Sequence, residues 1–258
     1  MALPRIIPVL LLKGRGLVKT VKFQKPVYVG DPMNAVKIFN EKEVDELIIL
    51  DINASHQGAE PQYDFLQEIV SECFSPLGYG GGVTSIAQVK RIIQSGIEKV
   101  VINTACITLP NFLREAADNF GSSTIVSAMD IKKNLWGKYT VYTHGGSRNT
   151  GIDPVKQAVA LQQQGAGELF LNNIDADGTM KGYDHAILRK IVDAVDIPVI
   201  ACGGASDMTD LFKAINESGA SAASAGSLFV FHGKHRAVLI TYPEYEVIQK
   251  GLNSNHKQ

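Results

Sequence analysis

The amino-acid sequence predicts an α/β fold in which eight parallel strands close into a (β/α)8 barrel. Eight short runs rich in valine and isoleucine alternate with amphipathic stretches of helical period along the whole chain. The runs are apolar throughout, as expected for parallel strands that are covered on both faces. A length of 258 residues is normal for one such barrel. An open, doubly wound sheet could be built from the same alternation and remains the second architecture.

The expected elements follow one another in chain order. The strand runs lie at residues 6–12, 46–52, 75–80, 99–104, 124–131, 168–174, 197–203 and 221–231. The helical stretches lie at residues 33–44, 63–74, 86–96, 157–165, 185–195 and 210–219. We expect a single barrel domain over residues 1–258, in which the polar tail at 253–258 frays.

A repeat within the chain favours the closed barrel over the open sheet. A shift of 122 residues lays Asp31-Pro32 on Asp153-Pro154, Glu46-Leu47 on Glu168-Leu169, and Gly81-Gly82 on Gly203-Gly204. Asp-Pro is a helix-start signal, with Asp as the N-cap and Pro at the first helical position. Four matched strand–helix units per half are the pattern of a barrel made by doubling. We therefore expect half-barrels at about 1–122 and 123–252.

Composition argues against several classes of function. The formal net charge of −1, from 25 basic and 26 acidic residues, gives no general support for binding nucleic acid or a membrane surface. The three cysteines, Cys73, Cys106 and Cys202, form no CxxC motif and no metal-ligand spacing, which favours a reducing cytoplasm. The N-terminal apolar run is too short for a signal peptide or a membrane span. We expect a cytoplasmic protein with no metal and no cofactor.

One aspartate interrupts an apolar run in the second half. Asp130 lies in TIVSAMDIKKN, and an offset of 119 aligns VLLLK with AMDIK, so that Leu11 stands opposite Asp130. Both positions lie near the C-terminal ends of strands, where the reactive groups of a (β/α)8 barrel gather. Two facing carboxylates could serve as general acid and general base, whereas leucine can do neither. Asp130 is the candidate catalytic residue; an aspartate that only caps the next loop is the alternative.

Glycine-rich strand ends predict two phosphate sites at the same end of the barrel. Phosphate binds backbone N–H groups that side chains do not shield, and glycine leaves them open. One candidate combines GYGGG at 78–82 with NTA at 103–105. The other combines IDADGT at 174–179, CGGA at 202–205 and AGS at 225–227. A ligand with a phosphate at each end would then span the mouth.

The segment at 13–30 is basic and contains several glycines. It carries Lys13, Arg15, Lys19, Lys22 and Lys25 and no acidic residue before Asp31. We expect a long loop, which either is solvated or closes as a lid over an anionic ligand.

Charged residues mark the other end of the expected barrel. Arg5 precedes the first strand, and Glu46, Lys99 and Glu168 open later strands. Side chains alternate along a strand, so Arg5 and Leu11 point the same way. If that direction is inward, a ring of alternating charge closes the floor. A stabilising ring of salt bridges is the usual role of that face; a gate for a small neutral molecule is the alternative.

The chain resembles the cyclase subunit of imidazole glycerol phosphate synthase over nearly its full length. The matching segments are RIIP, GDP, DELIILDINAS, GGG, KVVINTA, DIKK, NTGI, GAGELFLNNIDADGTMKGYD, IPVIACGGA and GSLF. The resemblance implies a barrel of lyase type that docks on a glutaminase subunit through its N-terminal face. Ammonia released from glutamine would pass through the barrel to a phosphorylated small-molecule substrate at the mouth, in histidine biosynthesis.

The resemblance also implies roles for individual residues. Asp130 matches a catalytic acid/base, Lys19 matches a loop lysine near the substrate, and Glu98 lies near the expected glutaminase interface. The residues that match the ammonia gate are Arg5, Glu46, Lys99 and Glu168. Those that match the two phosphate-site regions are Gly82, Asn103, Thr104, Asp177, Gly178, Gly203, Gly204, Gly226 and Ser227.

The chain departs from the family pattern at Leu11. The family has Leu-Asp-Val-Lys where this chain has LLLK, and GRG replaces the usual Asp-Gly-Arg. Loss of one of two cooperating acid/base groups commonly costs ~10²–10⁴ in rate. Three functions therefore remain: a working ammonia-dependent cyclase, an enzyme that adds ammonia to another phosphorylated or nucleotide-linked sugar, and a non-cyclising conduit. The conduit would activate the glutaminase and serve a separate sugar-amidating enzyme in surface-polysaccharide (lipopolysaccharide) biosynthesis.

Overall fold

A closed barrel of eight parallel strands forms the centre of the protein. The computed structural model describes residues 3–54, 58–233 and 235–253. The barrel strands are β1 (Arg5–Lys13), β4 (Leu47–Asp51), β5 (Leu77–Gly80), β6 (Lys99–Ile102), β7 (Ile125–Lys133), β10 (Glu168–Asn173), β11 (Val199–Cys202) and β12 (Ala222–Ala225). Each pairs in parallel with the next, and β12 pairs with β1, which closes the circle. The closed (β/α)8 barrel is confirmed, and the open sheet is wrong.

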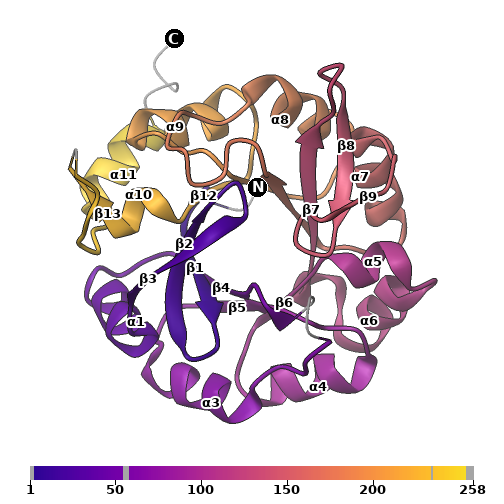
Figure 1. Cartoon of the computed structure of the whole chain (residues 1–258), viewed down its shortest axis with the longest axis horizontal. Helices are drawn as coiled ribbons and strands as arrows, with labels where there is room; N and C mark the ends of the chain where they lie inside the picture. The colour runs from indigo at the N-terminus through magenta and orange to yellow at the C-terminus, as the bar shows by residue number, and fades with distance from the viewer. Residues whose placement is uncertain (1–2, 55–57, 234, 254–258) are drawn as a thin grey trace.

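Helices surround this barrel, as the view down its axis shows (Figure 1). They are α1 (Pro32–Glu41), α3 (Tyr63–Glu72), α4 (Ile86–Gln94), α5 (Thr104–Thr108), α6 (Phe112–Phe120), α7 (Pro154–Gln163), α8 (His185–Val192), α9 (Met208–Asn216), α10 (Ser227–Val230) and α11 (Tyr245–Leu252), with a 3-10 turn at Ser122–Thr124. The two Asp-Pro signals act as expected. Asp31 and Asp153 are N-caps whose carboxylates accept backbone N–H groups of α1 and α7.

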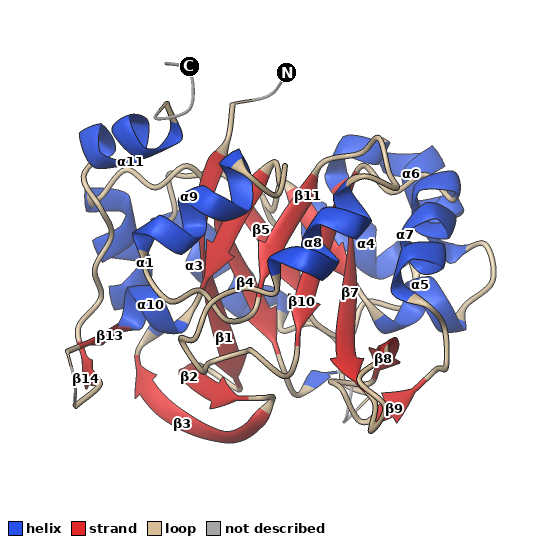
Figure 2. Ribbon diagram, turned by 90° about the horizontal axis from the view of Figure 1, so that it is seen from above, coloured by secondary structure: helices blue, strands red, loops and turns tan. Residues whose placement is uncertain are grey.

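Short antiparallel strands extend from one end of the barrel. They are β2 (Gly16–Val21), β3 (Gln24–Gly30), β8 (Tyr139–Thr143), β9 (Arg148–Asn149), β13 (Phe231–His232) and β14 (Ala237–Val238). In the side view these ribbons lie at one end, and the start of β1 and the helix α11 lie at the other (Figure 2). The ribbons therefore surround the mouth, at the C-terminal ends of the barrel strands.

Several expected boundaries were wrong. The segment at 13–30 is not a loop, because β1 runs on to Lys13 and β2 and β3 complete an antiparallel ribbon. Its alternation of apolar and basic residues is a strand pattern, but the many positive charges favour a solvated loop when the sequence is considered alone. The run at 221–231 is not one strand, since β12 ends at Ala225 and α10 follows. Helices α5, α6 and α11 were missed. Of the predicted tail, residues 254–258 lie outside the described residues.

The side chains of β1 separate two apolar layers, as strict alternation requires. Ile6, Leu10 and Leu12 pack outward against the helices. Ile7 and Val9 belong to a second cluster that fills the barrel interior, and Leu11 packs against it. We call this interior cluster the bore; its buried members are Ile7, Val9, Ile48, Val101, Val126, Ala128, Phe170, Ile200, Cys202 and Ala222.

Candidate active site

A cavity of about 490 Å³ opens at the mouth of the barrel. It gathers side chains and loops from both halves of the chain. The predicted residues that line it are Leu11, Lys19, Gly82, Asn103, Thr104, Asp130, Asp177, Gly226 and Ser227. The remaining three, Gly178, Gly203 and Gly204, line a smaller adjoining pocket of about 20 Å³, which also borders Asp177, Gly226 and Ser227. The residues proposed for the mouth are therefore brought together.

Asp130 is the most deeply buried carboxylate of this cavity. Its side chain is 6% exposed, and Asn103 Nδ2 donates to its Oδ2 at 2.7 Å. Burial, together with the nearby negative charge of Asp177, raises the pKa of Asp130 to about 7, while the Asn103 bond opposes the shift. A carboxyl group that titrates near neutrality can both take up and release a proton, which suits a general acid or base.

Leu11 occupies the place in the first half that Asp130 occupies in the second. Leu11 lies opposite Leu50 in the β1–β4 pair, and Asp130 lies opposite Asn172 in the β7–β10 pair. Leu11 and Asp130 both line the cavity. Two apolar side chains therefore stand in one half where a carboxylate and an amide stand in the other.

Lys19 reaches the cavity from strand β2 of the ribbon. Its Nζ donates to the carbonyl oxygen of Val9 at 2.7 Å, and the side chain is buried. Burial lowers the pKa of Lys19 to about 8, against the attraction of Asp177. Gly226 lies directly beneath the ammonium group, so that a Cβ at position 226 would overlap Nζ. The absence of a side chain at 226 is what leaves room for this lysine.

Replacing Gly226 with alanine should weaken the binding of inorganic phosphate by about tenfold or more, because Lys19 loses its position and its charge-assisted bond. Gly226 has φ −106°, so alanine can adopt its backbone conformation. Titration calorimetry on the whole chain measures the affinity. Lys19→Ala should give a similar loss, and the double variant should lose no more than either single one. Additive losses would show that Gly226 acts independently of Lys19.

The ribbon formed by β2 and β3 rests on the loop that follows β10. Lys22 N donates to the Asp177 carbonyl oxygen at 2.9 Å, and Thr20 Oγ1 lies 3.4 Å from Asp177 Oδ2. A side chain at Gly178 would overlap the carbonyl oxygen of Thr20, so glycine permits this contact. Burial raises the pKa of Asp177 to about 6, although Lys19 and Thr20 oppose the shift. Among the basic residues of 13–30, Lys19 is the one that lines the cavity.

Two glycine pairs follow equivalent strands, β5 and β11. We call Gly81 and Gly82 the first glycine cradle, and Gly203 and Gly204 the second glycine cradle. All four residues have positive φ, at +148°, +65°, +85° and +117° in that order. A Cβ on Gly203 would lie 2.6 Å from the carbonyl oxygen of Asn173, so no side chain fits there. Both pairs therefore need glycine, so that no side chain covers their backbone N–H groups.

Sequence reasoning missed several residues that line the cavity, among them Asp51, Gln88, His144 and Asn172. Asp51 ends β4 in the same way that Asp130 ends an apolar run, so a signal was present. Burial raises its pKa, while the backbone N–H groups of Asn53 and Ala54 oppose the shift. Asn172 also interrupts an apolar run, and His144 begins the glycine-rich segment HGGSRNTG at 144–151, which is typical of a turn over the mouth.

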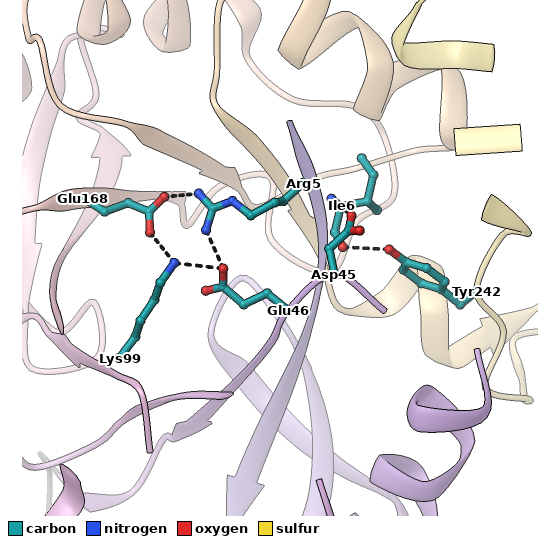
Figure 3. A network of polar contacts seen from close by, with 7 residues as sticks. All are labelled: Arg5, Ile6, Asp45, Glu46, Lys99, Glu168 and Tyr242. Carbon is teal, nitrogen blue, oxygen red and sulfur yellow. Dashed lines mark hydrogen bonds and ion pairs between the residues drawn. The ribbon is translucent and has the colours of Figure 1, made fainter. Parts of the chain in front are cut away.

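The four charged residues of the opposite face meet in one ring, which we call the floor ring (Figure 3). Arg5 contacts Glu46 and Glu168 through its two terminal nitrogens. Lys99 Nζ closes the ring at 2.8 Å from Glu46 and 2.9 Å from Glu168. Two positive and two negative groups thus alternate below the bore, so the inward direction expected for Arg5 is confirmed. Glu98 beside this ring is exposed.

Comparison with known proteins identifies the family. The model of the family described as "Histidine biosynthesis protein" matches residues 5–236. The chain belongs to the histidine biosynthesis protein family. The matched region includes the floor ring, the bore and every predicted residue of the mouth. The resemblance to the imidazole glycerol phosphate synthase subunit seen in the sequence is confirmed at the level of the family.

Curated relatives within the histidine biosynthesis protein family carry consistent names. One from Pseudomonas aeruginosa, "Putative imidazole glycerol phosphate synthase subunit hisF2", is 51% identical over 247 residues, 96% of this chain and 98% of that protein. The corresponding hisF3 protein of Vibrio vulnificus is 46% identical over 249 residues, 96% of each chain. A protein of Leptospira interrogans, "Putative imidazole glycerol phosphate synthase subunit HisF", is 45% identical over 244 residues, 94% of this chain and 96% of its own length.

Two further observations concern the described residues. Among them, no helix is long and apolar enough to cross a membrane. In the part of the chain that the structure describes, no three histidine, cysteine or acidic side chains come together as a group that could hold a metal ion.

Proposed function

We propose that this chain is the cyclase-type synthase subunit of a glutamine amidotransferase complex. A glutaminase subunit docks at its N-terminal face and supplies ammonia through the floor ring. The ammonia is used on a phosphorylated substrate at the mouth. The observation that carries the proposal is the continuous arrangement of charged ring, apolar bore and cavity along one barrel axis. The names of the relatives support the same function.

The bore suits a small uncharged molecule. Its buried members are aliphatic or aromatic apart from Cys202, so an ion would lose its hydration there without compensation. Gly80 of β5 lies close against the bore, because a Cβ there would lie 2.9 Å from Val101 Cβ, so the interior is closely packed with apolar groups. Ammonia is small and neutral, whereas ammonium would pay the full cost of desolvation. The ring's balanced charges favour neither sign of ion.

The mouth supplies the groups that a bisphosphate substrate needs. Lys19 and the two glycine cradles bind the phosphate groups, and Asp130 transfers protons near pH 7. Ring closure to an imidazole requires proton removal and proton donation at different atoms, for which the family pattern provides two aspartates. With Leu11 in the first position, this chain holds one, so we expect binding without efficient cyclisation.

A second candidate function is favoured by the same Leu11–Leu50 pair. In this alternative the chain is a non-cyclising conduit that activates the glutaminase and passes ammonia to a separate sugar-amidating enzyme of surface-polysaccharide biosynthesis. The two functions share the floor ring and the bore, and they differ in whether chemistry takes place at Asp130.

Steady-state assays with a glutaminase of the same family complex test the proposal. We expect the chain to stimulate glutamine hydrolysis while forming imidazole glycerol phosphate about 10²-fold or more slowly than a two-aspartate cyclase. Lys99→Met should lower glutamine-dependent product formation and leave the ammonium-dependent rate at the mouth unchanged, because ammonium salts supply the mouth from solvent. Turnover equal to that of a two-aspartate cyclase would contradict the assignment of Leu11. Unchanged glutamine dependence in Lys99→Met would contradict delivery through the floor ring.

A further inference from the structure

A single buried carboxylate, Asp210, joins two loops beside the second glycine cradle. Its Oδ2 accepts the backbone N–H of Tyr183 and the backbone N–H of Ser206, each at 3.1 Å. Tyr183 belongs to the loop that follows β10 and carries Gly178, whereas Ser206 belongs to the loop that follows the cradle. The spacing between these loops is therefore set by one side chain of α9.

The other oxygen of Asp210 is held by a histidine. His185 Nε2 lies 2.8 Å from Asp210 Oδ1, and His185 Nδ1 lies 2.9 Å from Ser218 Oγ. With a proton on Nε2, the imidazole donates to the carboxylate. Both oxygens of Asp210 thus have donors, which fixes the carboxylate in place.

The order serine, histidine, aspartate is also that of a hydrolase triad. That function does not fit here, because a nucleophile needs access to a substrate. Ser218 is 4% exposed, and neither mouth cavity borders Ser218 or His185. The geometry is that of a support for the loops.

A backbone bond strengthens the same link. Gly182 N donates to the carbonyl oxygen of Gly204 at 2.8 Å, one residue before Tyr183. A side chain on Gly204 would overlap the carbonyl oxygen of Gly182, so the two loops are in direct contact. The Asp210 bonds and this backbone bond together form what we call the loop clamp.

The first half offers a natural comparison at Gln88. Gln88 and Asp210 each hold the third position of the helix that follows a glycine cradle, 122 residues apart. Gln88 Oε1 accepts the backbone N–H groups of Thr84 at 2.7 Å and Ser85 at 3.1 Å. These two donors lie in its own loop, whereas Asp210 also takes a donor from the neighbouring loop. The half-barrels therefore support their cradles differently.

We propose that Asp210, held by His185, is a positioning residue that fixes the second glycine cradle for a phosphoryl group. The inference rests on the proposed function, in which this cradle binds one phosphate of the substrate. The clamp holds Gly203 and Gly204 against the loop of Gly178 before any ligand arrives, so binding costs little ordering of the loops. Cutting the clamp should reduce phosphate affinity at this cradle and leave the first cradle unaffected.

Titration of inorganic phosphate into the whole chain, followed through the amide NMR signals of Gly82, Gly203 and Gly204, tests the proposal. Asp210→Ala should weaken phosphate binding at the second cradle about tenfold or more, with less than a twofold change at Gly82. Gln88→Ala is the matched control and should weaken the first cradle only. Asp210→Asn keeps an acceptor for the loop N–H groups, and should restore most of the affinity.

Hydrogen exchange separates this inference from the proposed function. The amides of Tyr183 and Ser206 should exchange faster in Asp210→Ala than in the unsubstituted chain, and should be unchanged in Gln88→Ala. If phosphate binds neither cradle of the unsubstituted chain, the proposed function fails, while faster exchange at these two amides still supports the clamp. Two results would overturn the inference. One is an equal loss of phosphate affinity at both cradles in Asp210→Ala. The other is an unchanged phosphate affinity in both Asp210→Ala and Asp210→Asn when the two variants are folded.

Discussion

Replacing Leu11 with aspartate should raise the rate of imidazole ring closure by about 10²-fold or more, because it restores a second proton-transfer group at the mouth. Leu11 already lines the cavity, in the strand position equivalent to that of Asp130. The new carboxylate would stand beside Leu50, in apolar surroundings that raise its pKa toward neutrality. Turnover of the bisphosphate substrate with ammonium salts measures the gain.

Leu11→Asn is the matched control, since it has the shape of aspartate and cannot transfer a proton in the same way. A gain with asparagine as large as that with aspartate would show that polarity, and not acid/base chemistry, is what position 11 lacks. No gain with either residue would mean that the mouth differs from a cyclase in more than this side chain, and would favour the conduit.

Asp130→Asn should have opposite effects on activity and on stability. Loss of the remaining acid/base group should lower turnover by about 10²-fold or more, with little change in phosphate affinity. The folded pKa of about 7 lies above the ordinary value of 3.8, so the folded chain keeps a proton that the unfolded chain releases between these values. The contribution of Asp130 to the free energy of unfolding therefore falls as the pH rises from about 4 to about 7.

This linkage sets the size of the stability effect. At pH 8 the buried carboxylate costs at most about 4 kcal/mol of folding free energy relative to a neutral group. Asparagine has the shape of aspartate, and its side-chain oxygen can still accept the hydrogen bond from Asn103. The free energy of unfolding of the variant should therefore exceed that of the parent at pH 8 and be similar to it at pH 4. Urea unfolding at both values checks this, with Asp118→Asn on the exposed surface of α6 as control. Equal destabilisation at both pH values would contradict the raised pKa.

Regular periodicity accounts for what the sequence predicted well. The apolar runs of the barrel strands and the Asp-Pro signals before α1 and α7 are local patterns with one physical interpretation. The floor ring could also be predicted from the sequence, because alternation along β1 places Arg5 on the same face as Leu11. Its use as an ammonia gate is a separate matter and stays a prediction.

Features that depend on distant parts of the chain escaped. The lysines of the ribbon of β2 and β3 predict a solvated loop, yet Lys19 is buried between Val9 and Gly226. The role of Asp210 could not be inferred locally either, since its donors come from the loop after β10. In each case tertiary contacts determine the position of the side chain.

The pairing of β1 with β12 has a consequence for how the protein is made. Residues 5–8 align with residues 222–225, so β1 can pair with β4 early but meets its other barrel neighbour only after β12 has been made. Arg5 and the Lys19 contact with Gly226 both lie on this seam. Such distant pairings form slowly. The barrel is thus closed only once β12 exists, and a polypeptide that stops before Gly226 would leave Lys19 without this part of its setting.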